Sequence, residues 1–228
     1  MIGRAEVNMS SSPENSNNSR RRIILAGLYL FFVGGALCNG VHLLQPVMHF
    51  MTPLLLVAIG LLAAYLTYEV SLRSIAAILS VILLTFSAEV SGVNLGFPFG
   101  DYAYTHLLGP KVLDVPLVIP FGWLAILIPS WIAAERFLRY KHLVVASVLA
   151  MAADAVLEFA ADSLDWWHWK DGLPTELNYL TWFVLSYMSL AILQKHAKET
   201  NGHRIVPHLL IAQILYFFLS DAGLRYLS

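Results

Sequence analysis

Seven long runs of apolar residues, separated by short polar stretches, dominate this chain. Each run is close to the length that an α-helix needs to cross the hydrocarbon core of a bilayer, roughly 20 residues. The pattern therefore predicts an all-α fold, a polytopic membrane bundle of seven transmembrane helices. The predicted spans are residues 23–44, 53–70, 75–93, 116–138, 143–164, 177–193 and 206–224.

The first 22 residues have a different composition from the rest. They are polar, rich in Ser and Asn, and lack aromatic side chains, so residues 1–22 are predicted to be a disordered tail. Residues 23–228 then form a single transmembrane domain. Three arginines precede the first apolar run, as in a signal peptide, but that run is too long and shows no small-residue cleavage site.

Lysine and arginine positions predict the orientation. With the N-terminus in the cytoplasm, only Lys111, Lys170 and Arg225 of the 14 basic residues lie on the far side. We therefore expect an integral protein of the cytoplasmic (inner) membrane. This orientation places two polar connections, residues 97–110 and 162–174, together on the non-cytoplasmic side.

Composition agrees with a membrane protein and narrows the chemistry. Only 13% of the residues are charged, against about 25% in soluble domains. The net charge of -1 gives no basic surface for nucleic acid. The single cysteine, Cys38, excludes an intramolecular disulfide and a multi-cysteine zinc cluster.

Carboxylates occur where a membrane makes them costly. Asp154, Glu158, Asp162 and Asp165 are spaced by four, four and three residues, which places them on one helix face. Asp154 lies near mid-bilayer, where an ionisable group costs on the order of 3 kcal/mol and marks a functional site by default. Together with Glu89, this stripe favours a lined cavity over carboxylates that only hold helices together. We expect Asp162 and Asp165 to be solvated at the interface.

Other readings of the polar residues carry less weight. His42, His106 and His168 with a carboxylate could form a metal site, but no H-x-x-x-H or H-E-x-x-H pair occurs. A retinal Schiff base needs a lysine inside the bundle, and no span interior has one. The tryptophans gather near the two outer connections, where a membrane-interface belt and a pocket wall are both open interpretations.

The segment from residue 88 to residue 124 resembles the carotenoid biosynthesis membrane-protein family that includes carotenoid 1',2'-hydratases and bisanhydrobacterioruberin hydratases. The family block G-x-P-F-G-x-Y-x-Y-x-x-x-L-G-P, then V-P and a tryptophan, is matched by Gly96, Pro98, Phe99, Gly100, Tyr102, Tyr104, Leu108, Gly109, Pro110, Val115, Pro116 and Trp123. Further matches are Glu89, Asp154, the W-x-W pair Trp167 and Trp169, and the P-x-x-x-N pair Pro174 and Asn178. The chain departs from the family's D-x-x-x-D-P element, because Glu158 stands in place of the second Asp and Phe159 in place of the Pro.

The resemblance implies an enzyme that adds water to the terminal 1',2' double bond of an acyclic carotenoid. Protonation at C2' gives a tertiary cation at C1', which water captures, so no cofactor is expected. The implied catalytic carboxylates are Asp154, Glu158, Asp101 and Glu89. The implied substrate-binding residues are Tyr102, Tyr104, Trp123, Trp167, Trp169 and Asn178. The implied partners are a lipid-soluble carotenoid, the bilayer and other enzymes of carotenoid biosynthesis.

Three alternatives stay open from the residues alone. A cyclase-like enzyme would start from the same protonation but lose a proton instead of capturing water. A proton-coupled transporter could use the carboxylate face as a relay, although no internal repeat is visible. A zinc lipid hydrolase with seven spans is a third. We also expect residues 97–110 to fold back as a cap that brings Asp101 or Tyr104 near Glu89 and the carboxylates of the fifth span.

Overall fold

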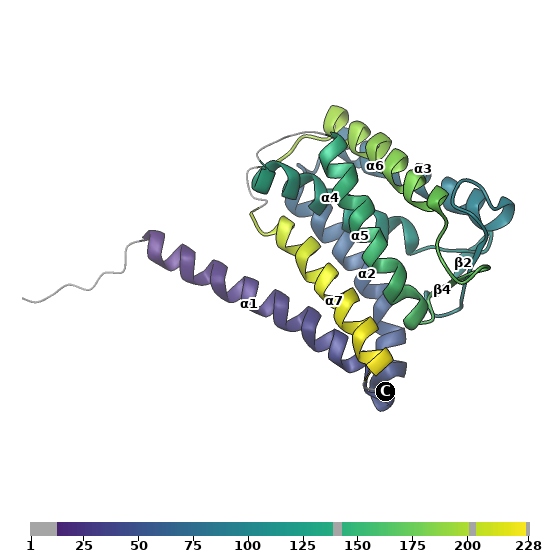
Figure 1. Ribbon diagram of the computed structural model, residues 1–228. Coiled ribbons are helices and arrows are strands. Elements are labelled where there is room, and N and C mark those ends of the chain that lie inside the picture. The colour runs from purple at the N-terminus through teal and green to yellow at the C-terminus, as the bar shows by residue number, and fades with distance from the viewer. Residues whose placement is uncertain (1–12, 139–142, 201–203, 227–228) are drawn as a thin grey trace, which may run out of the picture.

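The computed structural model describes residues 13–138, 143–200 and 204–226, and in these residues the chain forms seven α-helices (Figure 1). The helices are α1 (Pro13–Asn39), α2 (Gln45–Thr67), α3 (Leu72–Leu95), α4 (Ile119–Leu138), α5 (Leu143–Ser163), α6 (Glu176–His196) and α7 (Val206–Tyr226). A short 3-10 helix, η1 (His42–Leu44), leads into α2. The predicted all-α class is confirmed for this part of the chain.

Five helical segments are long and apolar enough to cross a membrane. They are Asn18–Asn39, His42–Thr67, Leu72–Leu95, Leu143–Ser163 and Val206–Arg225. Their packing is that of a membrane protein, because small residues face inward and large apolar residues face outward. On α5, for example, Ala150 and Ala153 are buried, whereas Val148 and Phe159 are exposed.

Helix α4 lies at the centre of the bundle. Its residues from Trp123 to Ala134 are all buried, and both of its tryptophans are among the largest fully buried side chains. A helix that is apolar all round is expected in such a position. Gly60 allows α2 to approach α4 closely, because a Cβ atom at Gly60 would lie 2.4 Å from the Phe121 carbonyl oxygen of α4.

Several predicted boundaries differ from the structure, and three helix starts are instructive. Helix α1 begins at Pro13, so residues 13–22 are helical; proline is favoured in the first turn of a helix. The rest of the predicted tail, residues 1–12, lies outside the described residues. Helix α2 begins at Gln45 and contains Pro53 within it, whereas the sequence predicted a span starting at residue 53. Pro116, predicted to open the fourth span, belongs to a strand.

The two connections at one end of the bundle form a small cap of β-structure, seen beside the ends of α3 and α6 in Figure 1. Strand β1 (Tyr102–Tyr104) pairs antiparallel with β4 (Trp167–Trp169), and β2 (Lys111–Val112) pairs with β3 (Val115–Pro116). The predicted fold-back of residues 97–110 is therefore present, and the partner strand comes from the connection between α5 and α6.

The chain turns into the cap at a glycine. Gly96 ends α3 with a φ of 68°, in the left-handed region that glycine adopts without strain. The Thr181 hydroxyl of α6 donates to the Pro98 carbonyl at 2.6 Å and so holds the cap on the bundle. Within the cap, Lys111 Nζ donates to the Tyr104 carbonyl at 2.6 Å. The cap is therefore fixed on top of the helices that carry the carboxylates.

Candidate active site

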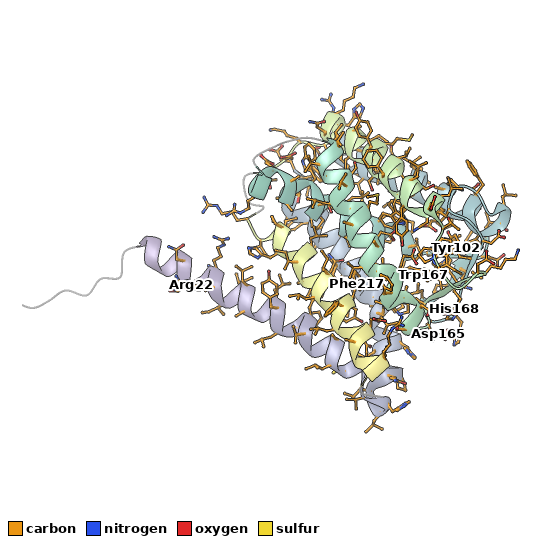
Figure 2. All side chains as sticks on the ribbon, in the orientation of Figure 1. Arg22, Tyr102, Asp165, Trp167, His168 and Phe217 are labelled. Carbon is orange, nitrogen blue, oxygen red and sulfur yellow. The ribbon has the colours of Figure 1, made fainter. Side chains whose placement is uncertain are left out.

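The β1–β4 ribbon presents four aromatic side chains to the bundle interior. Side chains alternate along a strand, so residues two apart share a face. Tyr102 lies opposite Trp169 and Tyr104 lies opposite Trp167. The central residues, Ala103 and His168, are exposed on the other face. The Y-x-Y and W-x-W sequences thus form a single aromatic ceiling, and Figure 2 shows Tyr102 and Trp167 together at the cap.

Glu89 of α3 accepts hydrogen bonds from three aromatic residues. The hydroxyls of Tyr102 and Tyr104 both donate to Glu89 Oε2, the latter at 2.8 Å, and Trp123 Nε1 donates to Oε1 at 2.8 Å. Its side chain is only 5% exposed. Burial and then the negative charge of Glu89 raise the pKa of both tyrosines, so the hydroxyls keep their protons and remain donors.

Glu158 of α5 is held in the same manner from the other strand. Trp167 Nε1 and Trp169 Nε1 donate to Glu158 Oε2 at 2.9 and 2.8 Å. Asn178 Nδ2 donates to Glu158 Oε1 at 3.3 Å and to Asp154 Oδ2 at 3.1 Å. One amide therefore bridges the two carboxyl groups, which lie one helical turn apart on α5.

The position of Asn178 follows from the start of α6. Thr175 is the N-cap residue, and its hydroxyl accepts from the Asn178 backbone N–H at 3.1 Å. The same hydroxyl donates to the Phe99 carbonyl of the cap. Thr175 thus ties the beginning of α6 to the cap and places the Asn178 side chain against α5.

A pair of stacked tryptophans forms another wall. The rings of Trp123 on α4 and Trp182 on α6 are 3.6 Å apart between centroids and nearly parallel, at 10°. Trp182 follows Asn178 by one helical turn, so the two side chains share a face of α6. The aromatic wall and the amide bridge are consequently built by the same stretch of helix.

These side chains enclose a cavity of about 60 Å³. Glu89, Asp154 and Glu158 all line it, and all three are buried. Within the described residues none of the three forms an ion pair, and their recorded side-chain partners are N–H and O–H donors. Close packing shapes the cavity at Gly92, where a Cβ atom would lie 2.6 Å from Phe99 Cδ2.

Nine of the ten residues named from the sequence come together here, and one does not. Asp101 is 57% exposed in its side chain and pairs with Lys170 at 3.0 Å, which raises the pKa of Lys170. It immediately precedes Tyr102, so alternation along the strand directs it away from the ceiling. The sequence predicted that Asp101 or Tyr104 would lie near Glu89. Tyr104 does so, whereas Asp101 lies outside the cavity.

The other two carboxylates of the α5 stripe are solvated, as predicted. Asp162 and Asp165 both pair with the exposed ring of His168, with His168 Nδ1 3.0 Å from Asp162 Oδ1. These hydrogen bonds, Asp162 first, raise the pKa of His168. Figure 2 shows Asp165 and His168 together at the cap. In the described part of the chain no three His, Cys, Asp or Glu side chains are placed to hold a metal ion.

The structure adds cavity residues that the sequence reasoning did not select. Trp182 could have been found from its spacing to Asn178. Gln213, a single amide in the apolar run of α7, is 3% exposed and lines the cavity. Its Nε2 donates to the Ala125 and Leu209 carbonyls at 2.9 and 3.1 Å. A lone polar residue within a predicted span was the available signal.

Comparisons with known proteins point to one family. The family described as carotenoid biosynthesis protein matches residues 50–227. Bisanhydrobacterioruberin hydratase of Haloarcula japonica is 26% identical over 119 residues, which cover 47% of this chain. The match covers 40% of that relative, so this chain spans about two fifths of its length. No solved structure matches.

Proposed function

This chain belongs to the carotenoid biosynthesis protein family, and from that premise we propose that it is a membrane enzyme that hydrates the terminal 1',2' double bond of an acyclic carotenoid. The observation that carries the proposal is the buried group of three carboxylates around a small cavity: Glu89 and Glu158 accept from aromatic N–H and O–H donors, and Asp154 accepts from the amide of Asn178. Such a site can donate a proton, stabilise a cation and hold water.

The reaction needs one proton and one water. A carboxylic acid transfers its proton to C2', and the electron pair of the double bond forms the new C–H bond, which leaves a tertiary cation at C1'. The oxygen of water bonds to C1', and the resulting oxonium gives its extra proton to a carboxylate. The sum is addition of one water, with no change in the number of electrons.

Hydrogen-bond geometry supports Asp154 as the acid. Glu89 and Glu158 each accept three hydrogen bonds, whereas Asp154 accepts one, from Asn178. Its second oxygen, Oδ1, has no donor among the described residues. Two ionised carboxylates sharing one amide in a buried site would repel, and a proton on one of them relieves this. Asp154 can carry that proton and present it to the cavity.

Glu89 and Glu158, which each accept three hydrogen bonds, support the step in which water captures the cation. Glu89 and Glu158 face a cavity of about 60 Å³, which has room for a few water molecules at roughly 10–15 Å³ each. Either one can orient the water and receive its proton. The presence of polar space beside the acid favours capture by water over cyclisation, which requires the cation to be kept dry.

The aromatic walls support the cationic step. The faces of tryptophan and tyrosine attract a cation within about 6 Å of the ring centre, by roughly 0.5–2 kcal/mol each. Trp123, Trp182, Tyr102 and Tyr104 all line the cavity. A cation formed there would contact several rings before water reaches it.

We also propose the membrane arrangement expected from the sequence. All seven helices cross the cytoplasmic membrane, the N-terminus is cytoplasmic, and the cap lies on the other side. A lipid-soluble carotenoid then reaches the site from the bilayer, and other carotenoid biosynthesis enzymes supply it.

Pigment analysis tests the proposal. The full-length protein is produced in cells that accumulate lycopene, and extracted pigments are separated by chromatography and weighed by mass spectrometry. We expect products heavier by one water, and none from cells that carry the Asp154→Asn variant. A product of unchanged mass and altered spectrum would identify a cyclase, and unaltered pigment across acyclic and monocyclic substrates would refute the proposed activity.

A further inference from the structure

A second, larger cavity lies between α1, α2 and α7. Its volume is about 430 Å³, and its lining is almost entirely apolar. The α1 wall is formed by Leu30, Phe31, Phe32, Gly34, Gly35 and Cys38. The facing walls come from the first half of α2 and from Tyr216 and Phe217 of α7. We refer to this space as the apolar groove.

A shared wall of side chains separates the groove from the carboxylate cavity. Leu56, Trp166, Gln213 and Phe217 line both spaces. Trp166 and Phe217 meet edge to face, with ring centroids 6.3 Å apart. A molecule that entered the groove would need to pass only this partition to reach the carboxylates.

The groove reaches the outer surface of the bundle. Leu30 and Phe31, which line it, are 73% and 55% exposed. Figure 1 shows α1 on the outside of the bundle, alongside α7. In a bilayer this surface faces hydrocarbon, so an apolar molecule can enter the groove from the side without crossing water.

The size of the carboxylate cavity sets a requirement on any long substrate. A space of about 60 Å³ holds only the end of a long hydrocarbon, so the remainder must lie in a neighbouring apolar space. The groove is the apolar space that shares its wall. We propose that the apolar groove binds the polyene chain of a carotenoid while its terminal double bond projects past Leu56, Trp166 and Phe217 to the carboxylates. This inference rests on the proposed function.

Gly34 offers a way to fill the groove without disturbing the protein. A Cβ atom there would meet no atom within 4 Å, so Gly34→Phe directs a ring into the open groove. Gly27 is a matched control on the same helix. It also has nothing within 4 Å of a Cβ atom, but it does not line the groove. The two variants change helix propensity and apolarity equally.

Alkylation of Cys38 reports on occupancy of the groove in the wild-type protein. It is the single cysteine of the sequence, it is free, and it lines the groove. The full-length protein in phosphatidylcholine nanodiscs is treated with N-ethylmaleimide, with and without lycopene, and the rate of alkylation is followed by mass spectrometry. We expect bound lycopene to slow the alkylation roughly tenfold, as a site occupied about nine-tenths of the time would.

The variants complete the test. Lycopene bound to each protein is measured by visible absorption after reconstitution. We expect Gly34→Phe to bind roughly tenfold less tightly than the wild type and Gly27→Phe to bind equally well. Equal binding by both variants, equal loss in both, or alkylation unaffected by lycopene would each overturn the groove assignment. Protection and selective loss without any hydrated product would support the groove and refute the proposed reaction, so the two failures are distinguishable.

Discussion

Two sets of carboxylates at the same end of the molecule have opposite surroundings. The inner set is Glu89, Asp154 and Glu158. The outer set is Asp101, Asp162 and Asp165. The inner carboxylates are at most 6% exposed and accept hydrogen bonds from neutral donors. The outer ones are more than half exposed in their side chains and pair with Lys170 or His168.

The comparison shows that the cap, rather than the helix, decides what a carboxylate can do. Asp154, Glu158 and Asp162 follow one another at helical spacing on α5. Trp167 and Trp169 of the ceiling donate to Glu158. Asn178, which the cap helps to position, donates to Asp154, and Asp162 lies beyond these donors. Exposed ion pairs contribute little because water screens them. Buried carboxylates that have no cation beside them are stabilised by the hydrogen bonds of their donors. Removing one of those donors therefore costs more free energy than breaking an exposed ion pair.

The largest effect is expected for Asp154→Asn. If Asp154 is the proton donor, its loss should lower the hydration rate by about 10²–10⁴, the contribution typical of a general acid. Asp162→Asn, two turns further along the same helix, should keep near-normal activity. The measurement is hydrated carotenoid formed per amount of inserted protein. Normal activity in Asp154→Asn would move the acid to another carboxylate.

The sequence predicted the inner set because its signals are local. A carboxylate within an apolar run is visible without knowing the fold, and the four-residue spacing of Asp154 and Glu158 places them on one face. The helices were predictable for the same reason, although Pro53 lies inside α2 where a helix start was expected.

The ceiling depends on a pairing that no local pattern contains. Strands β1 and β4 come from connections about 60 residues apart, and their register decides which rings face each other. Without that pairing, the position of Asp101 within a matched motif made it a candidate. In a strand, neighbouring side chains point to opposite faces, so Tyr102 faces inward and Asp101 faces solvent.

A second test replaces Glu89 by Gln. The side-chain amide would place N–H groups against the Tyr102, Tyr104 or Trp123 donors, leaving buried groups unsatisfied at about 1–3 kcal/mol. We expect roughly tenfold or greater loss of activity and a melting temperature lower by about 2–4 °C per kcal/mol. Asp101→Asn is the control from the outer set and should change activity less than about twofold. If both variants behave alike, the distinction between inner and outer carboxylates does not hold.

A milder change is Trp169→Phe, which keeps an aromatic ring but removes one of the three donors to Glu158. Loss of one such hydrogen bond costs about 0.5–1.5 kcal/mol, so hydration should slow several-fold, roughly tenfold at most. Trp131→Phe removes the same kind of bond, from Nε1 to Glu199 at 2.8 Å, away from the cavity. It should lower stability but leave the rate per folded protein unchanged. Equal slowing in both would mean that Trp169 acts through stability alone.

The smallest effect is expected from His168, which belongs to the outer set. Its pKa is raised by Asp162 and Asp165, so the folded cap favours the protonated ring. The resulting stabilisation is fully present below the unfolded pKa of about 6.5 and is lost as the pH rises through the higher folded value. Because the three side chains are about half exposed, it should stay below about 1 kcal/mol.

Thermal unfolding of the wild type and His168→Gln measures this contribution. The wild type should be slightly more stable near pH 6, and the difference should vanish near pH 9, where the ring is neutral in both states. Hydration rates of the two proteins should agree at either pH, because His168 lies on the outer face of the ribbon. A difference in stability that grows with pH, or a rate that follows His168, would connect the outer carboxylates to the cavity and remove the separation between the two sets.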